Sequence, residues 1–106
     1  MSTKKTSLGQ YLRELRKEKE ETLHGVSKGT DIDSPLLSKI ERGERLPTSD
    51  QLKRLSRFYK VAEASLKAKL AAEKIVKDYG LNDTTYDAIR LVEEQLVEYG
   101  KKPSNS

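Results

Sequence analysis

Apolar residues along most of the chain recur every three or four positions, which is the period of amphipathic helices. This pattern predicts six helices and no strands, with no internal repeat. The first predicted helix begins after Ser7, whose side chain is expected to cap it, and runs to about Lys19 without a glycine to end it. The second, from Leu23 to about Gly29, is capped by Thr22. It contains two glycines and is therefore the weakest of the six.

A tight turn and a third, unusually polar helix follow. Asp31 is the expected turn residue, because Asp tolerates left-handed backbone. Ser34 is expected to cap the third helix, Pro35 suits its first position, and Gly43 suits its end. Leu37 and Ile40 face one side with Leu36 at the edge, while the polar residues point away: Ser34, Ser38, Lys39 and Arg42. A helix with so little to bury is expected to lie against something other than the protein's own core.

Three more helices complete the prediction. The fourth, about 51–59, is capped by Ser49 or Asp50, and the fifth, about 62–79, is rich in alanine and stopped by Gly80. The sixth opens at Asn82 or Asp83 and ends at Gly100. Its apolar residues follow a heptad-like spacing of three, four and three: Ile89, Val92, Leu96 and Tyr99.

A change of composition near residue 60 suggests a division of the chain. We expect a helix-turn-helix unit over 7–61, a two-helix extension over 62–100 that serves dimerisation, and a disordered polar tail over 101–106.

Composition narrows the classes of function. The chain has 106 residues, enough for one domain, with 34% hydrophobic and 36% charged residues. It has no cysteine and a single histidine, His24, so no disulfide, thiolate nucleophile or His/Cys metal site is expected. No base, nucleophile and orienting group come together, which argues against an enzyme or a cofactor. No run approaches the ~20 apolar residues of a membrane span, and no secretory signal is recognisable, so a cytoplasmic location is expected.

The basic residues are concentrated in one segment. Residues 34–60 carry seven basic and three acidic side chains, whereas the segments before and after have net charges of +1 and −1. A local basic surface is typical of nucleic-acid binding. Charge alone leaves open a solvated face with incidental charge.

The two short helices around Thr30-Asp-Ile-Asp33 have the arrangement of a helix-turn-helix, in which the second helix enters the major groove. Ser34 and Ser38 are short hydrogen-bonding groups near the start of that helix. Lys39 and Arg42 suit the acceptor edge of guanine, and Leu36 suits a thymine methyl.

Phosphate contacts are expected around this helix. Thr22 and the N–H groups that open the second helix suit a phosphate, with His24 as a phosphate neighbour or a solvated residue. Arg45 would add a contact. Three more basic residues would extend the set, although a solvated helix face explains them more simply: Lys53, Arg54 and Arg57.

Residues 22–45, TLHGVSKGTDIDSPLLSKIERGER, resemble the lambda-repressor-like helix-turn-helix of the Cro and xenobiotic-response-element (XRE) regulators. The resemblance covers about 7–60 and is most specific in LLSKIERGERLP. It implies an all-α, five-helix DNA-binding domain with a C-terminal helical extension. It also implies a buried ion pair between Arg16 and Glu41.

The chain departs from the family pattern at several positions. Glu20 and Asp31 stand where the family usually has glycine, and Gly25 and Ser27 replace the usual residues of the second helix. Leu23 and Pro35 stand where it often has Gln. The resulting set of expected DNA-binding residues is Thr22, Leu23, Ser34, Pro35, Leu36, Ser38, Lys39, Arg42 and Arg45.

Two interpretations of function follow. In the first, the protein is a homodimeric, sequence-specific transcriptional regulator of double-stranded DNA, acting as a repressor or autoregulator and dimerising through the seam of the sixth helix. In the second, it is an antitoxin or adaptor whose main task is to bind a protein partner through the C-terminal helices. Contact of Ile89 and Leu96 with a second copy would favour the first, and a hydrophobic groove left open would favour the second.

Overall fold

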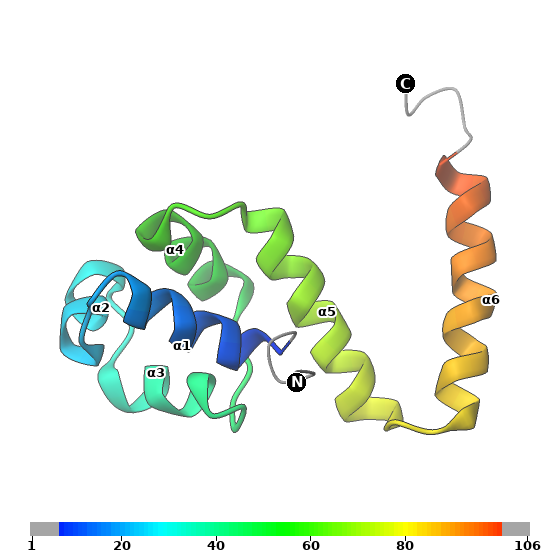
Figure 1. Ribbon diagram of the computed structural model, residues 1–106, viewed down its shortest axis with the longest axis horizontal. Helices are drawn as coiled ribbons and strands as arrows, with labels where there is room; N and C mark the ends of the chain where they lie inside the picture. The colour runs from blue at the N-terminus through cyan, green and yellow to red at the C-terminus, as the bar shows by residue number, and fades with distance from the viewer. Residues whose placement is uncertain (1–6, 101–106) are drawn as a thin grey trace. The chain divides into compact units, whose positions relative to one another are not determined.

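The computed structural model describes residues 7–100, and this part of the chain forms six α-helices and no strand (Figure 1). The expected tail 101–106 lies outside the described residues. The helices are α1 (Leu8–Glu18), α2 (Leu23–Thr30), α3 (Ser34–Glu41), α4 (Ser49–Tyr59), α5 (Glu63–Tyr79) and α6 (Asp83–Gly100). The predicted fold class is therefore correct, and α6 continues through Gly100, where an end was expected.

The caps of two helices lie one residue or more before the expected ones. Asp33, not Ser34, caps α3: its carboxylate accepts the Leu36 N–H at 2.9 Å, and its carbonyl accepts the first helical hydrogen bond, from Leu37. Pro35 is thus at the second position of the helix, where it again has no N–H to satisfy. Thr48, not Ser49 or Asp50, caps α4 in a capping box with Gln51.

The first two helices end without a glycine. Glu20 adopts φ 56° after α1, and its N–H bonds to Lys17 O while the Glu21 N–H bonds to Arg16 O. This is a Schellman motif with glutamate at the usual glycine position. Asp31 ends α2 with φ 62°, as predicted for the turn. The chain accepts the left-handed conformation at non-glycine residues to place α2 and α3.

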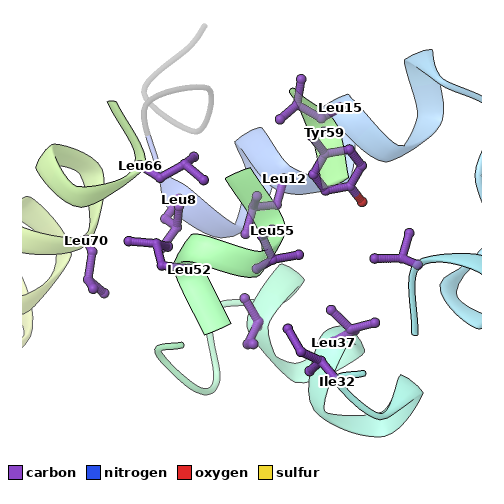
Figure 2. Packing of buried hydrophobic residues seen from close by; sticks show 12 residues of the cluster. Leu8, Leu12, Leu15, Ile32, Leu37, Leu52, Leu55, Tyr59, Leu66 and Leu70 are labelled. Atoms are coloured by element: carbon purple, nitrogen blue, oxygen red, sulfur yellow. The ribbon is translucent and has the colours of Figure 1, made fainter. Parts of the chain in front are cut away.

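Twelve buried apolar residues form the core (Figure 2). They come from α1–α5 and from the turn before α3: Leu8, Leu12, Leu15, Val26, Ile32, Leu37, Ile40, Leu52, Leu55, Tyr59, Leu66 and Leu70. Gly9 allows α1 to lie against the end of α3, because a Cβ there would come within 2.5 Å of Ile40 O and 2.7 Å of Glu41 O. The core thus fixes α3 by its inner face.

The chain divides into two compact units between Lys74 and Ile75, later than the boundary expected at 61/62. The reason is that α5 contributes to the first core: Leu66 and Leu70 are buried, and the Glu73 carboxylate accepts the Leu8 N–H at 3.2 Å. The first unit therefore includes most of α5. The second unit contains the end of α5 and α6, and α6 has no buried residue.

Candidate nucleic-acid interface

Helix α3 has two faces of different chemistry. Leu37 and Ile40 are 3% and 2% exposed in the core, and Leu36 packs against the core while half-buried. On the other side, Lys39 and Arg42 are exposed. The inner residues hold the helix in place, so its polar face is presented by a rigid support.

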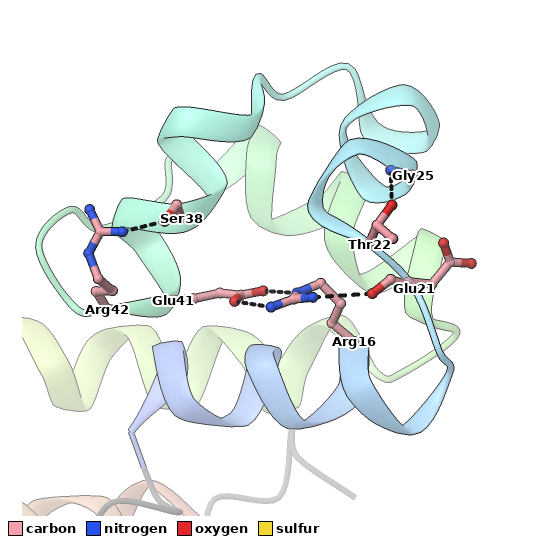
Figure 3. Close-up of polar contacts among 7 residues, drawn as sticks. All are labelled: Arg16, Glu21, Thr22, Gly25, Ser38, Glu41 and Arg42. Atoms are coloured by element: carbon pink, nitrogen blue, oxygen red, sulfur yellow. Dashed lines mark hydrogen bonds and ion pairs between the residues drawn. The ribbon is translucent and has the colours of Figure 1, made fainter.

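An ion pair anchors the end of α3 to α1. The Arg16 guanidinium donates to both carboxylate oxygens of Glu41, from Nε at 2.8 Å and from Nη2 at 3.0 Å, and Nη1 donates to Glu21 O at 3.1 Å (Figure 3). The side chains are only 14% and 6% exposed, and the hydrogen bond to Glu41 raises the pKa of Arg16. The pair implied by the family resemblance is present, and it also binds the carbonyl just before α2.

Tyr59 lies in the core close to this ion pair. Burial raises the pKa of its phenol, and the negative charge of Glu41 raises it further. The neutral phenol is therefore the stable form beside the pair.

Arg42 points away from this anchor and makes its own set of polar contacts. Its Nε donates to Glu44 Oε2 at 2.8 Å, its Nη2 donates to Glu44 Oε1 at 3.2 Å, and its Nη1 donates to Ser38 Oγ (Figure 3 shows the Ser38 contact). Arg42 and Glu44 are 50% and 53% exposed. Glu44 was not among the expected site residues. Its only signal in the sequence is an acidic residue two positions after an arginine, across the helix-ending glycine.

The other expected DNA-binding residues lie at the start of α2, on α3 and in the loop after α3, with unequal exposure. Thr22, Pro35 and Arg45 are exposed, whereas Ser34 and Ser38 are half-buried. Thr22 also caps α2, because its hydroxyl accepts the Gly25 N–H at 2.9 Å. Leu23 and Leu36 pack against the core, so only part of each side chain is accessible to a ligand.

Arg54, one of the expected additional phosphate contacts, makes polar contacts with other residues of the first unit. Its Nη1 donates to Thr30 O at 3.3 Å, and its Nη2 pairs with Asp50 at 2.7 Å. It therefore satisfies a carbonyl at the end of α2, a structural role with no signal in the sequence. Lys53 and Arg57 on the same helix, like His24 on α2, are exposed.

A hollow of about 410 Å³ lies beside the start of α1 and the end of α3. Arg13 and Arg42 line it together with Glu41 and Glu73. Since both signs of charge are present, this hollow is not a uniformly basic phosphate site.

The second unit contains an apolar groove of about 580 Å³. It is lined by Ile75, Tyr79, Asn82, Thr84, Thr85, Ala88, Ile89 and Val92. Of the expected seam, Ile89 and Val92 line the groove and are 43% and 48% exposed, and Leu96 and Tyr99 are 59% and 58% exposed. The four seam residues thus present apolar surface along α6.

Within residues 7–100 no cluster of three or more His, Asp or Glu side chains could hold a metal ion. None of the helices described is both long and apolar enough to cross a bilayer.

Comparison with known proteins gives two matches. A family described as "helix-turn-helix domain" matches residues 7–68. The crystal structure of the clp gene regulator ClgR from Corynebacterium glutamicum is similar, with a TM-score of 0.54 and 19% sequence identity, covering 100% of this chain and 98% of that one. This similarity shows a shared fold. No curated protein matches the sequence.

Proposed function

Because the chain belongs to the helix-turn-helix domain family, which matches residues 7–68, we propose that it is a sequence-specific, DNA-binding transcriptional regulator. In this proposal α3 enters the major groove of double-stranded DNA, and the protein acts as a repressor or autoregulator. ClgR, which shares the fold, is named as a gene regulator. The family is one of non-enzymatic DNA-binding domains, so no catalytic step is part of the proposal.

The observation that carries the proposal is the exposed polar face of α3. Lys39 and Arg42 stand on the outside of a helix whose other face is fixed by Leu37 and Ile40. Long basic side chains on a rigid helix fit the acceptor edge of guanine. Thr22 with the opening of α2, and Arg45 after α3, would hold phosphates on either side of that helix.

The test is fluorescence anisotropy with duplex DNA from just upstream of the protein's own gene, compared with a scrambled duplex of the same composition. We expect tighter binding of the upstream duplex by a factor of about 10³ or more. Measurements at two salt concentrations then estimate the number of neutralised phosphates. Weak and equal binding of both duplexes would reject the proposal.

Two substitutions separate base reading from phosphate binding. Lys39→Ala and Arg42→Ala are expected to weaken binding to the upstream duplex more than to the scrambled one, with unchanged helix content. Lys67→Ala, an exposed lysine on α5, is the matched control for lost positive charge. Equal losses of affinity for both duplexes would instead show that the two residues contact phosphates.

The proposal includes a homodimer formed through the seam of α6: Ile89, Val92, Leu96 and Tyr99. The support is physical, since an 18-residue helix without buried residues lacks the tertiary packing that stabilises most helices in proteins. Dimers of helix-turn-helix domains bind two half-sites about 34–36 Å apart, so a two-fold dimer would supply the second copy of α3 that such a site needs.

Sedimentation equilibrium with a charge placed in the seam tests the dimer. Leu96→Glu is expected to shift the mass from two chains to one. Leu91→Glu, on another face of the same helix and similarly exposed at 60% against 59%, is expected to leave the mass unchanged. A wild-type protein that is monomeric at all concentrations would reject the dimer.

The open groove of the second unit favours one alternative function. An antitoxin or adaptor would bind a helix of a different protein in the groove lined by Ile75, Ile89 and Val92. A monomeric wild type that does not discriminate between the two duplexes would favour this alternative over the regulator.

A further inference from the structure

The contacts of Arg42 point to a role for Glu44 that goes beyond the proposed function and rests on it. We propose that Glu44 is a positioning residue for base recognition: it fixes the guanidinium of Arg42 so that the remaining pair of N–H donors reads a guanine. Glu44 itself need not touch the DNA.

The first support is the set of hydrogen bonds. A guanidinium has five N–H donors. Within residues 7–100, Nε and Nη2 each donate to Glu44, and Nη1 donates to Ser38. Two donors are left, one on Nη1 and one on Nη2.

These two donors match one base better than the others. In the major groove, guanine offers two acceptors side by side, O6 and N7, whereas adenine pairs an acceptor with a donor and thymine offers one acceptor. The Glu44 carboxylate already occupies the edge of Arg42 formed by Nε and Nη2. The two remaining donors, on Nη1 and Nη2, can therefore bind O6 and N7 of one guanine.

The second support is the backbone that carries Glu44. Gly43 adopts φ 79°, its N–H bonds to Ile40 O at 3.1 Å, and the Glu44 N–H bonds to Lys39 O at 2.9 Å. This Schellman motif fixes the residue after the glycine relative to the last turn of α3. The carboxylate is therefore attached to the same rigid unit as Arg42.

The charge and the exposure of Glu44 fit a role in positioning Arg42 and do not fit a role in stabilising the fold. The Arg42 guanidinium lowers the pKa of Glu44, so the carboxylate is ionised at neutral pH. Both side chains are about half exposed, and exposed ion pairs contribute little to stability. Variants of Glu44 are therefore expected to fold, which circular dichroism can verify.

The experiment is a double-mutant cycle of Arg42→Ala and Glu44→Ala, read as the ratio of affinities for the upstream and scrambled duplexes. Glu44→Ala is expected to lower this ratio about tenfold, in the range of coupling between residues in contact. Its affinity for the scrambled duplex is expected to stay equal or to rise, because a negative charge near phosphate is removed. In the Arg42→Ala background the same substitution is expected to leave the ratio unchanged.

A modified base sharpens the test. Replacing guanines one at a time by 7-deazaguanine removes the N7 acceptor. We expect one position at which the wild type loses affinity and Glu44→Ala loses much less. Glu18→Ala, an exposed acid on α1, makes the same change of charge and is expected to behave as the wild type.

Each remaining outcome overturns the inference. A gain in affinity by Glu44→Ala that is equal on both duplexes would show that Glu44 acts only by repelling phosphate. An effect on the ratio that persists without Arg42 would show that Glu44 acts independently of it. A wild type that discriminates between duplexes while Glu44→Ala matches it rejects this inference alone, and a wild type that does not discriminate rejects the proposed function as well.

Discussion

The two units of the chain use their apolar residues in opposite ways. All twelve core residues belong to the first unit, which ends at Lys74. Within residues 7–100, the ten exposed large hydrophobic residues all lie at or after Val76, in the second unit. The first unit completes its core from its own helices, whereas the second leaves its large apolar side chains exposed. The same type of substitution is therefore expected to have different consequences in the two units.

The largest difference is expected for the loss of a leucine side chain. Leu52→Ala removes a side chain that is 0% exposed and should lower the free energy of unfolding by about 3 kcal/mol or more, from lost burial and the cavity that remains. Leu91→Ala, at 60% exposure, should change it by less than about 0.5 kcal/mol. Urea denaturation followed by circular dichroism measures both. Similar losses would contradict the contrast between the units.

The next largest effect on stability is expected from breaking one of two Arg–Glu pairs within the first unit. Glu41→Ala leaves the largely buried Arg16 without its carboxylate partner and should cost about 3 kcal/mol, seen as a lower melting temperature. Glu44→Ala breaks the exposed pair with Arg42 and should leave the melting temperature nearly unchanged. A melting temperature unaffected by Glu41→Ala would reject its structural role.

A smaller effect, of opposite sign, is expected at a helix end. Glu20 adopts φ 56°, which costs a non-glycine residue about 1–2 kcal/mol. Glu20→Gly should therefore raise the free energy of unfolding of the first unit by about 1 kcal/mol.

The matched change in the second unit is Gly80→Ala. Gly80 has φ 82°, so alanine there should strain the end of α5 without altering the main unfolding transition. Differential scanning calorimetry separates the two results. A destabilised Glu20→Gly variant would mean that the side chain of Glu20 has a role beyond the backbone.

The smallest effect on stability is expected from removing α6. Of the residues that the structure describes, a chain ending at Gly80 loses none that is buried, since α6 has none. Its melting temperature, measured well below the concentration of self-association, should stay close to that of the full chain. Binding to the upstream duplex should nevertheless weaken if α6 forms the dimer. A large drop in melting temperature would show that α6 supports the first unit.

Much of the fold could be predicted from local patterns. The apolar period placed all six helices to within a few residues, and Asp31 was identified as the left-handed turn residue. The local pattern does not distinguish the caps, because Asp33 and Ser34, or Thr48 and Ser49, are adjacent residues that can all cap a helix. The compact units divide after Lys74 and not at the expected 61/62. The alanine-rich sequence of α5 does not show that Leu66 and Leu70 belong to the first core.

The candidate site likewise combines features that the sequence predicts with features that only the structure shows. The sequence by itself determined that α3 has an apolar inner face and a basic outer face, because helical periodicity is a local property of the chain. The ion pair of Arg16 with Glu41 was implied by the family resemblance and is present. Only the tertiary structure decided what the other two arginines do: Arg54 donates to the Thr30 carbonyl at the end of α2, and Arg42 is held by Glu44. The residues look alike in the sequence, and their partners lie up to 25 positions away. Packing of α2 against α4 brings Arg54 to Thr30, and the left-handed backbone of Gly43 orients Glu44 toward Arg42. The pattern of charged residues along the sequence therefore shows neither role.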